Sequence, residues 1–171
     1  ASDSLAAVNF FNALLQVRSG DGSWGEAYHA VSGVALINDK LTARNGWMLM
    51  ALNYYYDALG DPAALNAAIS LAHWLLPYQD MDPMHGIYGA FKLGQSPYPY
   101  SCSTEGNADI VSGFFGLSDF VSGTFKDTLT IRATLAAQWI VNNMWTPNPW
   151  NFFEVGTIDT LGTLFEGADE R

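Results

Sequence analysis

The chain alternates between stretches with helical periodicity and long loops rich in glycine, proline and aromatic residues. Apolar residues recur at intervals of three and four positions in five stretches, and that spacing predicts five helices. Their predicted bounds are residues 4–18, 46–59, 62–76, 105–122 and 128–144. A sixth stretch, residues 157–166, has the composition of the start of another buried helix. The pattern therefore predicts an all-α fold.

The predicted helices are of two kinds. Residues 46–59 and 105–122 are apolar nearly all round, which is typical of a helix buried on most of its circumference. Residues 62–76 and 128–144 instead have one apolar stripe each, formed by Leu65, Ile69, Ala72 and Leu76 in the first and by Ile131, Leu135 and Trp139 in the second. The short turn Gly60-Asp61-Pro62 supplies a C-cap, an N-cap and a first helical residue in succession. We therefore expect each buried helix to pack antiparallel to the amphipathic helix that follows it.

The two pairs of helices are copies of one another. Thr42, Asn45 and Asp57 recur as Thr104, Asn107 and Asp119 at a spacing of 62, and His73-Trp74 recurs as Gln138-Trp139 at 65. In the loops, Trp24, Tyr88 and Phe152 follow one another at 64. A fixed period of this length indicates repeated helical hairpins. Such repeats suit an α/α toroid, in which buried helices line an inner ring and amphipathic helices form an outer ring.

The chain holds about three such hairpins in its 171 residues, which we interpret as a single domain, 1–171, that is partial or open. An open arc would expose helices that are apolar on both sides. We therefore expect self-association, or a missing half from a longer chain, to complete the ring.

The connections between repeats are unequal in length. The turn inside each hairpin takes a few residues, whereas residues 23–41, 77–102 and 145–155 form long aromatic connections between hairpins. Long loops without secondary structure are usually functional or disordered, and aromatic content argues against disorder. All three connections are predicted to lie at one rim, beside the N-termini of the inner helices, and we expect the functional site there.

Charge and composition exclude several classes of function. Seven Lys and Arg against 17 Asp and Glu give a net charge of −10, which argues against a nucleic-acid backbone or an anionic membrane as partner. The one cysteine, Cys102, has no accompanying Cys-His pattern and is interpreted as an inert small residue. No metal cluster, phosphate loop or serine nucleophile motif is found, so no cofactor is expected. The start at Ala1 suits a processed extracellular or periplasmic protein as well as an excised segment.

Three segments resemble the bacterial six-hairpin glycosidase-like proteins. They are Ser103-Thr-Glu-Gly-Asn-Ala-Asp109, which opens an inner helix, Gln138-Trp-Ile-Val with Met144-Trp145 at the end of an outer helix, and the loop Trp150–Gly156. The resemblance covers residues 42–156 and implies an (α/α)6 barrel that binds or cleaves carbohydrate at the inner-helix N-termini. A closed barrel of that family has six hairpins, about twice the number in this chain.

Glycoside hydrolysis uses two carboxyl groups that flank the bond. Glu105 and Asp109 are one helical turn apart on one face, and both would lie at the cavity that the resemblance implies. We predict Glu105 as general acid, with Asp109 or Glu26 as its partner. The alternative is that Glu105 and Asp109 only cap the helix.

Aromatic and polar residues of the loops are predicted to bind substrate, because an aromatic ring offers a flat apolar face to a sugar. These residues are Trp24, Tyr28, His29, His85, Tyr88, Tyr98, Tyr100, Trp150 and Glu154. The fixed spacing of Trp24 and Tyr88 also fits residues that anchor the loops to the toroid.

Two other functions remain open. Residues 16–25, Gln-Val-Arg-Ser-Gly-Asp-Gly-Ser-Trp-Gly, are similar to the Gln and Gly-x-Trp motif of triterpene cyclases and prenyltransferases, with a spacing two residues longer. A non-catalytic module that binds glycan or a partner protein is the other alternative.

Overall fold

The structure, a computed structural model, describes residues 2–94, 99–147 and 152–164. Its helices are α1 (Ser2–Gln16), α2 (Thr42–Leu59), α3 (Pro62–Leu75), α4 (Thr104–Ser118) and α5 (Gly123–Trp139). A 3-10 turn, η1 (Leu76–Tyr78), follows α3, and a π-helical turn, η2 (Ile140–Met144), follows α5. The five predicted helices and the mostly α fold are confirmed. The predicted sixth helix is wrong for residues 157–164, which form the end of a short strand and a turn.

Three short antiparallel ladders join the loops. They pair β1 (Ala27–Tyr28) with β2 (Ala35–Ile37), β3 (Cys102–Ser103) with β6 (Gly156–Thr157), and β4 (Trp145–Thr146) with β5 (Phe152–Phe153). The ladder of β3 and β6 ties the second long loop to the third just before α4 begins.

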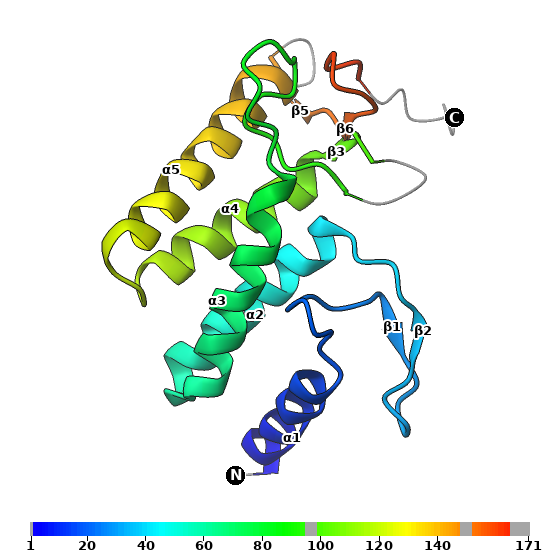
Figure 1. The fold of residues 1–171 in the computed structure, drawn as a ribbon, viewed down its shortest axis with the longest axis vertical. Helices are drawn as coiled ribbons and strands as arrows, with labels where there is room; N and C mark the ends of the chain where they lie inside the picture. Colours follow the sequence, from blue (N-terminus) through cyan, green and yellow to red (C-terminus); the bar gives the residue numbers. More distant parts are fainter. Residues whose placement is uncertain (1, 95–98, 148–151, 165–171) are drawn as a thin grey trace.

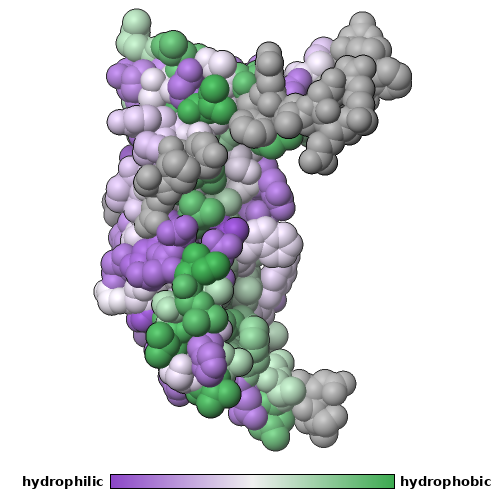
Figure 2. All heavy atoms as spheres, turned by 90° about the vertical axis from the view of Figure 1, so that its right-hand side faces the viewer, coloured by the Kyte–Doolittle hydropathy of each residue, from purple (hydrophilic) through white to green (hydrophobic). Residues whose placement is uncertain are grey.

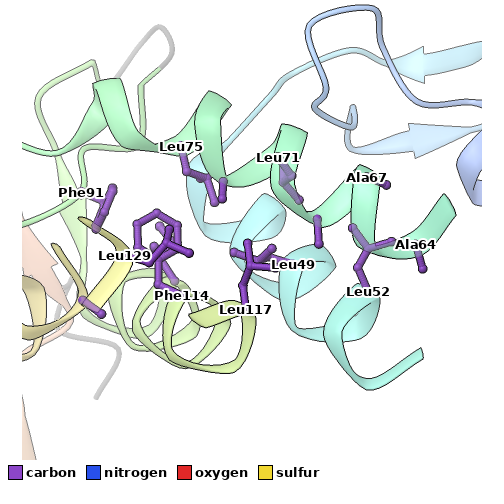
Figure 3. Close-up of a cluster of buried hydrophobic side chains, with 14 of the residues drawn as sticks. Leu49, Leu52, Ala64, Ala67, Leu71, Leu75, Phe91, Phe114, Leu117 and Leu129 are labelled. Carbon is purple, nitrogen blue, oxygen red and sulfur yellow. The ribbon is translucent and has the colours of Figure 1, made fainter. Parts of the chain in front are cut away.

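The helices form two hairpins that share one core. α2 packs against α4, while α3 covers α2 and α5 covers α4 (Figure 1). The hairpin turn has the predicted chemistry: Gly60 ends α2 at φ 67°, and the Asp61 side chain accepts a hydrogen bond from Ala63 N at 2.8 Å. Figure 3 shows side chains of both hairpins meeting in the core, with Leu49 and Leu52 from α2 opposite Phe114 and Leu117 from α4.

The outer helices bury a stripe that matches the predicted one only at Ala72 and Trp139. The buried face of α3 is formed mostly by alanine: Ala64, Ala67, Ala68, Leu71, Ala72 and Leu75. Leu65, Ile69 and Leu76 lie half-buried at its margin. In α5, Ile131 is 58% exposed, and the buried residues are Leu129, Ala133, Ala136 and Trp139. The small alanine side chains bring the outer helices close to the inner ones, so the larger apolar residues flank the contact and do not fill it.

The inner helices approach one another through glycine. A Cβ atom on Gly106 would lie 2.4 Å from the Cβ of Ala43, and one on Gly113 would lie 2.9 Å from Leu49 Cδ2. Both helices expose part of their surface, since Trp47 and Tyr54 of α2 are 58% and 71% exposed and Phe115 of α4 is 40% exposed. The sides of α2 and α4 that face each other and their outer helices are buried, and the remaining side of α2 is open.

Each inner helix holds the preceding loop through one buried asparagine. The Asn45 side chain accepts from Trp24 N at 2.9 Å and donates to Trp24 O at 3.1 Å. Asn107 makes the same pair of hydrogen bonds to Phe91, at 2.6 and 3.0 Å. We call this arrangement an amide bridge. It corrects the predicted loop repeat, since the residue equivalent to Trp24 is Phe91 and not Tyr88.

A second contact ties each inner helix to the loop that follows its hairpin. The hydroxyl of Thr42 donates to Lys92 O at 2.8 Å, and that of Thr104 donates to Glu154 O at 2.6 Å. The repeated Thr and Asn thus fasten the long loops to the N-termini of α2 and α4. Each of the three long loops is thus attached to the N-terminus of an inner helix, while the β1–β2 hairpin of the first loop lies beside α1.

The face of the molecule that includes α1 carries much exposed apolar surface. Phe11 of α1 stacks on Tyr55 of α2 with ring centroids 4.0 Å apart, which joins α1 to the array. Leu5 and Phe10 on α1 are each 62% exposed, and Val31 in the turn between β1 and β2 is 92% exposed. Figure 2 shows hydrophobic surface over the lower half of this face, where α1 and the hairpin lie. None of the described helices is both long and apolar enough to span a bilayer.

Candidate functional site

A cavity of about 440 Å³ lies where the N-termini of α2 and α4 meet. We call it the rim cavity. From α2 it is lined by Ala43, Arg44 and Trp47, from α4 by Glu105, Gly106 and Asp109, and from the loops by Leu41, Leu93 and Ser103. Gly106 keeps the two helices close enough at this point for side chains of both to reach one space. The cavity combines two carboxyl groups, one guanidinium and one indole.

Glu105 and Asp109 differ in their surroundings although they are one turn apart. Glu105 is exposed in the first turn of α4, where the helix dipole stabilises a negative charge. Ser103 caps this turn by accepting from Gly106 N at 3.1 Å, so neither carboxylate is needed as the cap. Asp109 is half-buried, and its Oδ2 atom is shielded from solvent without a hydrogen-bond partner among the described residues.

The pKa of Asp109 is raised above its ordinary value. Burial is the main cause, the charge of Glu105 adds to it, and a hydrogen bond from Trp47 acts in the opposite direction. A carboxyl group with a raised pKa keeps its proton to higher pH, as a general acid requires. Asp109 therefore has the property that a proton donor of this pair needs, whereas the prediction named Glu105 for that role.

Glu26 reaches the edge of the rim cavity through an ion pair. It lies in the first long loop, and its Oε2 atom contacts Nη1 of Arg44, whose side chain lines the cavity. Glu26 itself lines a separate cavity between α1 and the β1–β2 hairpin. Its placement fits the orientation of Arg44 better than a direct role beside Asp109.

A smaller cavity of about 240 Å³ adjoins the rim cavity, with which it shares Leu93 and Ser103. It lies between the second and third loops and is also lined by Cys102, Val155 and Thr157. Burial raises the pKa of the Cys102 thiol to about 12, so the thiol is protonated at neutral pH. Cys102 therefore has the inert, packed character predicted from the sequence.

Two of the predicted substrate-binding residues, Trp24 and Glu154, make hydrogen bonds that hold the loops in place. Trp24 is 3% exposed, and its Nε1 donates to Leu14 O at 2.8 Å. The alternative prediction that Trp24 anchors its loop is confirmed. Glu154 accepts from the Thr146 hydroxyl at 2.8 Å within the third loop and does not line the rim cavity.

Of the other residues that were predicted to bind substrate, those that the structure describes do not line the rim cavity and lie in separate parts of the structure. Tyr28 and His29 line the cavity between α1 and the β1–β2 hairpin. His85 and Tyr88 line another cavity beside α5. Tyr100 is 56% exposed just before β3. Tyr98 and Trp150 lie outside the described residues.

Arg44 and Trp47 are the lining residues that sequence reasoning missed. Trp47 belongs to the predicted helix 46–59, and it precedes Asp109 by 62 residues, the spacing at which Thr42 and Asn45 recur. Extending that spacing along both helices would have placed Trp47 and Asp109 at equivalent positions of the rim. Among the residues that the structure describes, no group of three or more His, Cys, Asp or Glu side chains is placed to hold a metal ion.

Comparison with known proteins supports the fold. Two solved structures resemble the chain: an unsaturated glucuronyl hydrolase from Bacillus sp. GL1, responsible for the degradation of glycosaminoglycan, and a sugar epimerase from a ruminal bacterium. The first aligns with a TM-score of 0.64 and 14% identity over 86% of this chain and 42% of the hydrolase. The second aligns with a TM-score of 0.63 and 13% identity over 95% of this chain and 39% of the epimerase.

No family model and no curated protein sequence matches the chain. Both neighbours are carbohydrate-active α/α toroids, so the chain has the fold of an α/α toroid. It spans about two fifths of the length of either neighbour.

Proposed function

We propose that the chain is part of a carbohydrate-active α/α toroid, most simply a glycoside hydrolase, that acts on poly- or oligosaccharide at the rim cavity. The observation that carries the proposal is the half-buried Asp109, with its raised pKa and unpaired Oδ2, beside the exposed Glu105 in a cavity that also offers Trp47. Two carboxyl groups in different surroundings are the arrangement by which glycosidases separate a proton donor from a charged partner.

In this proposal Asp109 donates a proton to the glycosidic oxygen. Glu105, which is exposed, is the second carboxyl group, and it acts on the sugar carbon directly or through a water. The Trp47 indole supplies an apolar face for a sugar ring, and Arg44, oriented by Glu26, binds oxygen atoms at the cavity edge. Completion of the ring, by a further segment or by self-association, would close the open side of α2 beside Trp47 and exclude water from the site.

The test is release of reducing sugar from a panel of neutral and acidic polysaccharides. Asp109→Asn and Glu105→Gln should each abolish release, because each removes one of the two carboxyl groups while retaining size. Asp119→Asn is the matched control, since Asp119 is exposed at the opposite end of α4. Release that persists in Asp109→Asn would refute the assignment of the donor.

A non-catalytic glycan-binding module is the second candidate, because the same indole and guanidinium can bind sugar without turnover. Glycan retained by the wild-type chain on an affinity gel, with no release of reducing sugar, would favour the module over the hydrolase. A folded chain that neither binds nor cleaves any member of the panel would remove the carbohydrate function.

A further inference from the structure

Among the residues that the structure describes, Arg44 is the one basic residue that lines the rim cavity, and its charge is already paired. Its Nη1 atom contacts Oε2 of Glu26, whose side chain is 30% exposed. A guanidinium that is paired with a carboxylate offers little net positive charge to a second anion. An anionic ligand would have to compete with Glu26 for Arg44.

Two lysines beside the cavity are paired in the same way. Lys40 and Lys92 each directly precede a loop residue that lines the rim cavity. Lys40 Nζ lies 2.8 Å from Oδ2 of Asp21. Lys92 Nζ lies 3.4 Å from Oδ2 of the buried Asp80. A carboxylate on a substrate would therefore meet a protein carboxylate at each of these ammonium groups.

The lining itself adds two carboxyl groups, Glu105 and Asp109. The charge of Glu105 acts within the cavity, since it contributes to the raised pKa of Asp109. An anionic ligand in the same space would meet the same repulsion. The net charge of −10 on the whole chain acts in the same direction.

The helix N-termini at the cavity do not reverse this repulsion. Free N–H groups in the first turn of a helix attract anions. Here Thr42 N and Thr104 N, the first of each inner helix, donate to carbonyl oxygens of the loops at 3.3 and 2.8 Å. Gly106 N donates to Ser103 Oγ at 3.1 Å. The loops and the cap thus take up N–H groups that a carboxylate would need.

Glu26 is held in position to pair with Arg44 by the first loop. Its backbone N donates to Ile37 O at 2.9 Å. Trp24, two residues earlier, is fixed by the amide bridge of Asn45. Asn45 follows Arg44 in α2, so one helical turn both anchors the loop and receives its carboxylate. The ion pair is therefore a fixed part of the cavity edge.

We propose that the rim cavity takes an uncharged sugar unit in preference to a uronate, and that Glu26 sets this preference by neutralising Arg44. The proposal rests on the carbohydrate function proposed above and adds the class of sugar. An unpaired guanidinium binds a carboxylate through two parallel hydrogen bonds. With Glu26 in place, the N–H groups of Arg44 that remain can donate to sugar hydroxyl oxygens, which are neutral acceptors. Glu26 is thus a residue that determines specificity.

The experiment compares polysaccharides that share a backbone and differ in charge. The probes are polygalacturonate, glucuronan and alginate, each paired with its carboxyl-reduced form, in which the uronate is converted to the neutral hexose. Release of reducing sugar and retention on an affinity gel are measured for both forms at low ionic strength. The wild-type chain should favour the carboxyl-reduced form of the best pair by at least about fivefold. Added salt should narrow the difference, because it screens exposed charges.

Glu26→Gln leaves Arg44 without its anionic partner and should narrow the preference by about fivefold, the contribution of a partly exposed ion pair. The double variant Glu26→Gln with Arg44→Gln should return to the wild-type preference, because the gain on the uronate requires the guanidinium. Asp119→Asn is the matched control, since it removes one negative charge at the opposite end of α4 and should leave the preference unchanged.

The outcomes separate this proposal from the carbohydrate function itself. Equal or better action of the wild-type chain on the uronate forms would overturn the charge preference and leave the carbohydrate function in place. A Glu26→Gln variant with the same preference as Asp119→Asn would overturn the role of Glu26. A folded chain that neither binds nor cleaves any of these polysaccharides would overturn both.

Discussion

The amide bridge of Asn107 is expected to be among the largest single contributions to the stability of the fold. Its side chain is 1% exposed and makes three hydrogen bonds: one from Phe91 N, one to Phe91 O and one to Ser103 O. Asn107→Ala removes all three and leaves the N–H and C=O groups of Phe91 buried without partners.

The magnitude follows from these contacts. The hydrogen bond to Ser103 O contributes about 1 kcal/mol, and each of the two buried backbone groups of Phe91 that loses its partner costs roughly 1–3 kcal/mol. We therefore expect Asn107→Ala to lower the free energy of unfolding by about 3 to 7 kcal/mol. Asn45→Ala should cost about as much, since Asn45 makes the equivalent bonds to Trp24 and Leu41. Asn53→Ala should cost only about 1 kcal/mol, because Asn53 makes one hydrogen bond, to Gly113 O, and its own Oδ1 is already unpaired.

Replacement of Asn107 by aspartate tests the donor half of the bridge. An ionised Asp can accept from Phe91 N but repels the carbonyl oxygens of Phe91 and Ser103, so its folded-state pKa would be raised. A raised pKa means that the variant is most stable below the unfolded pKa of about 3.9 and loses stability as pH rises through the folded value. Asn107→Asp should therefore approach the wild-type chain near pH 3 and fall well below it at pH 7.

The assay is urea unfolding followed by circular dichroism and tryptophan fluorescence, at pH 7 and near pH 3. Asn66→Ala is the surface control and should change the free energy of unfolding by less than about 0.5 kcal/mol. An Asn107→Ala variant within about 0.5 kcal/mol of wild type, or one no worse than Asn53→Ala, would refute the reasoning.

Three further outcomes follow from the structure. Gly106→Ala should lower the free energy of unfolding by about 1–3 kcal/mol in the same assay despite the better helix propensity of alanine, because the new Cβ would lie 2.4 Å from that of Ala43. Gly20→Ala is the control, because nothing lies within contact distance of a Cβ at that position. Equal effects of the two substitutions would contradict a close contact of the helices at Gly106. Burial raises the pKa of Asp21, but hydrogen bonds from Lys40 and Ser23 outweigh burial and lower this pKa to about 2. The ionised Asp21 therefore stabilises the fold fully above pH 3.8, the ordinary pKa of the group, and this stabilisation is lost as pH falls through about 2. Because the Asp21 side chain is 44% exposed, Asp21→Asn should cost no more than about 1 kcal/mol at pH 7 and nothing near pH 2, and a constant cost across that range would exclude the ion pair as its cause. The Cys102 thiol, with a pKa of about 12, should react with a thiol reagent in urea but not in the native chain at pH 8, and rapid native labelling would show that the second and third loops open easily.

The helices and the repeat could be predicted because both are local properties of the sequence. Periodicity, the Gly60-Asp61-Pro62 turn and the recurrence of Thr and Asn at 62 residues were enough to define the hairpins and the rim. The buried stripe of α3 was not predictable from hydrophobicity, since close approach of the helices favours alanine over the larger Leu65 and Ile69. Helical spacing alone does not show how near the next helix lies.

The candidate site was predicted in part for the same reason. Glu105 and Asp109 share a helix face by spacing alone, but their different surroundings depend on Trp47 and the neighbouring helix. The ion pair of Glu26 with Arg44 joins residues from a loop and a helix, and no local pattern indicates it. The spacing of Trp24 and Tyr88 was misleading because the two loops differ in length, while the bridged residues Trp24 and Phe91 are defined by hydrogen bonds.

The register of β4 and β5 has a consequence for how such an array is extended. Glu154 N donates to Met144 O, so the next pair along the ladder, Trp145 and Phe153, is one in which the backbone groups point away from the partner strand. Phe91 stands in the same relation to Gln79, and there the outward N–H and C=O receive Asn107. The backbone N–H and C=O of Phe153 are thus oriented like those of Phe91, and an asparagine from a further hairpin could bind them in the same way.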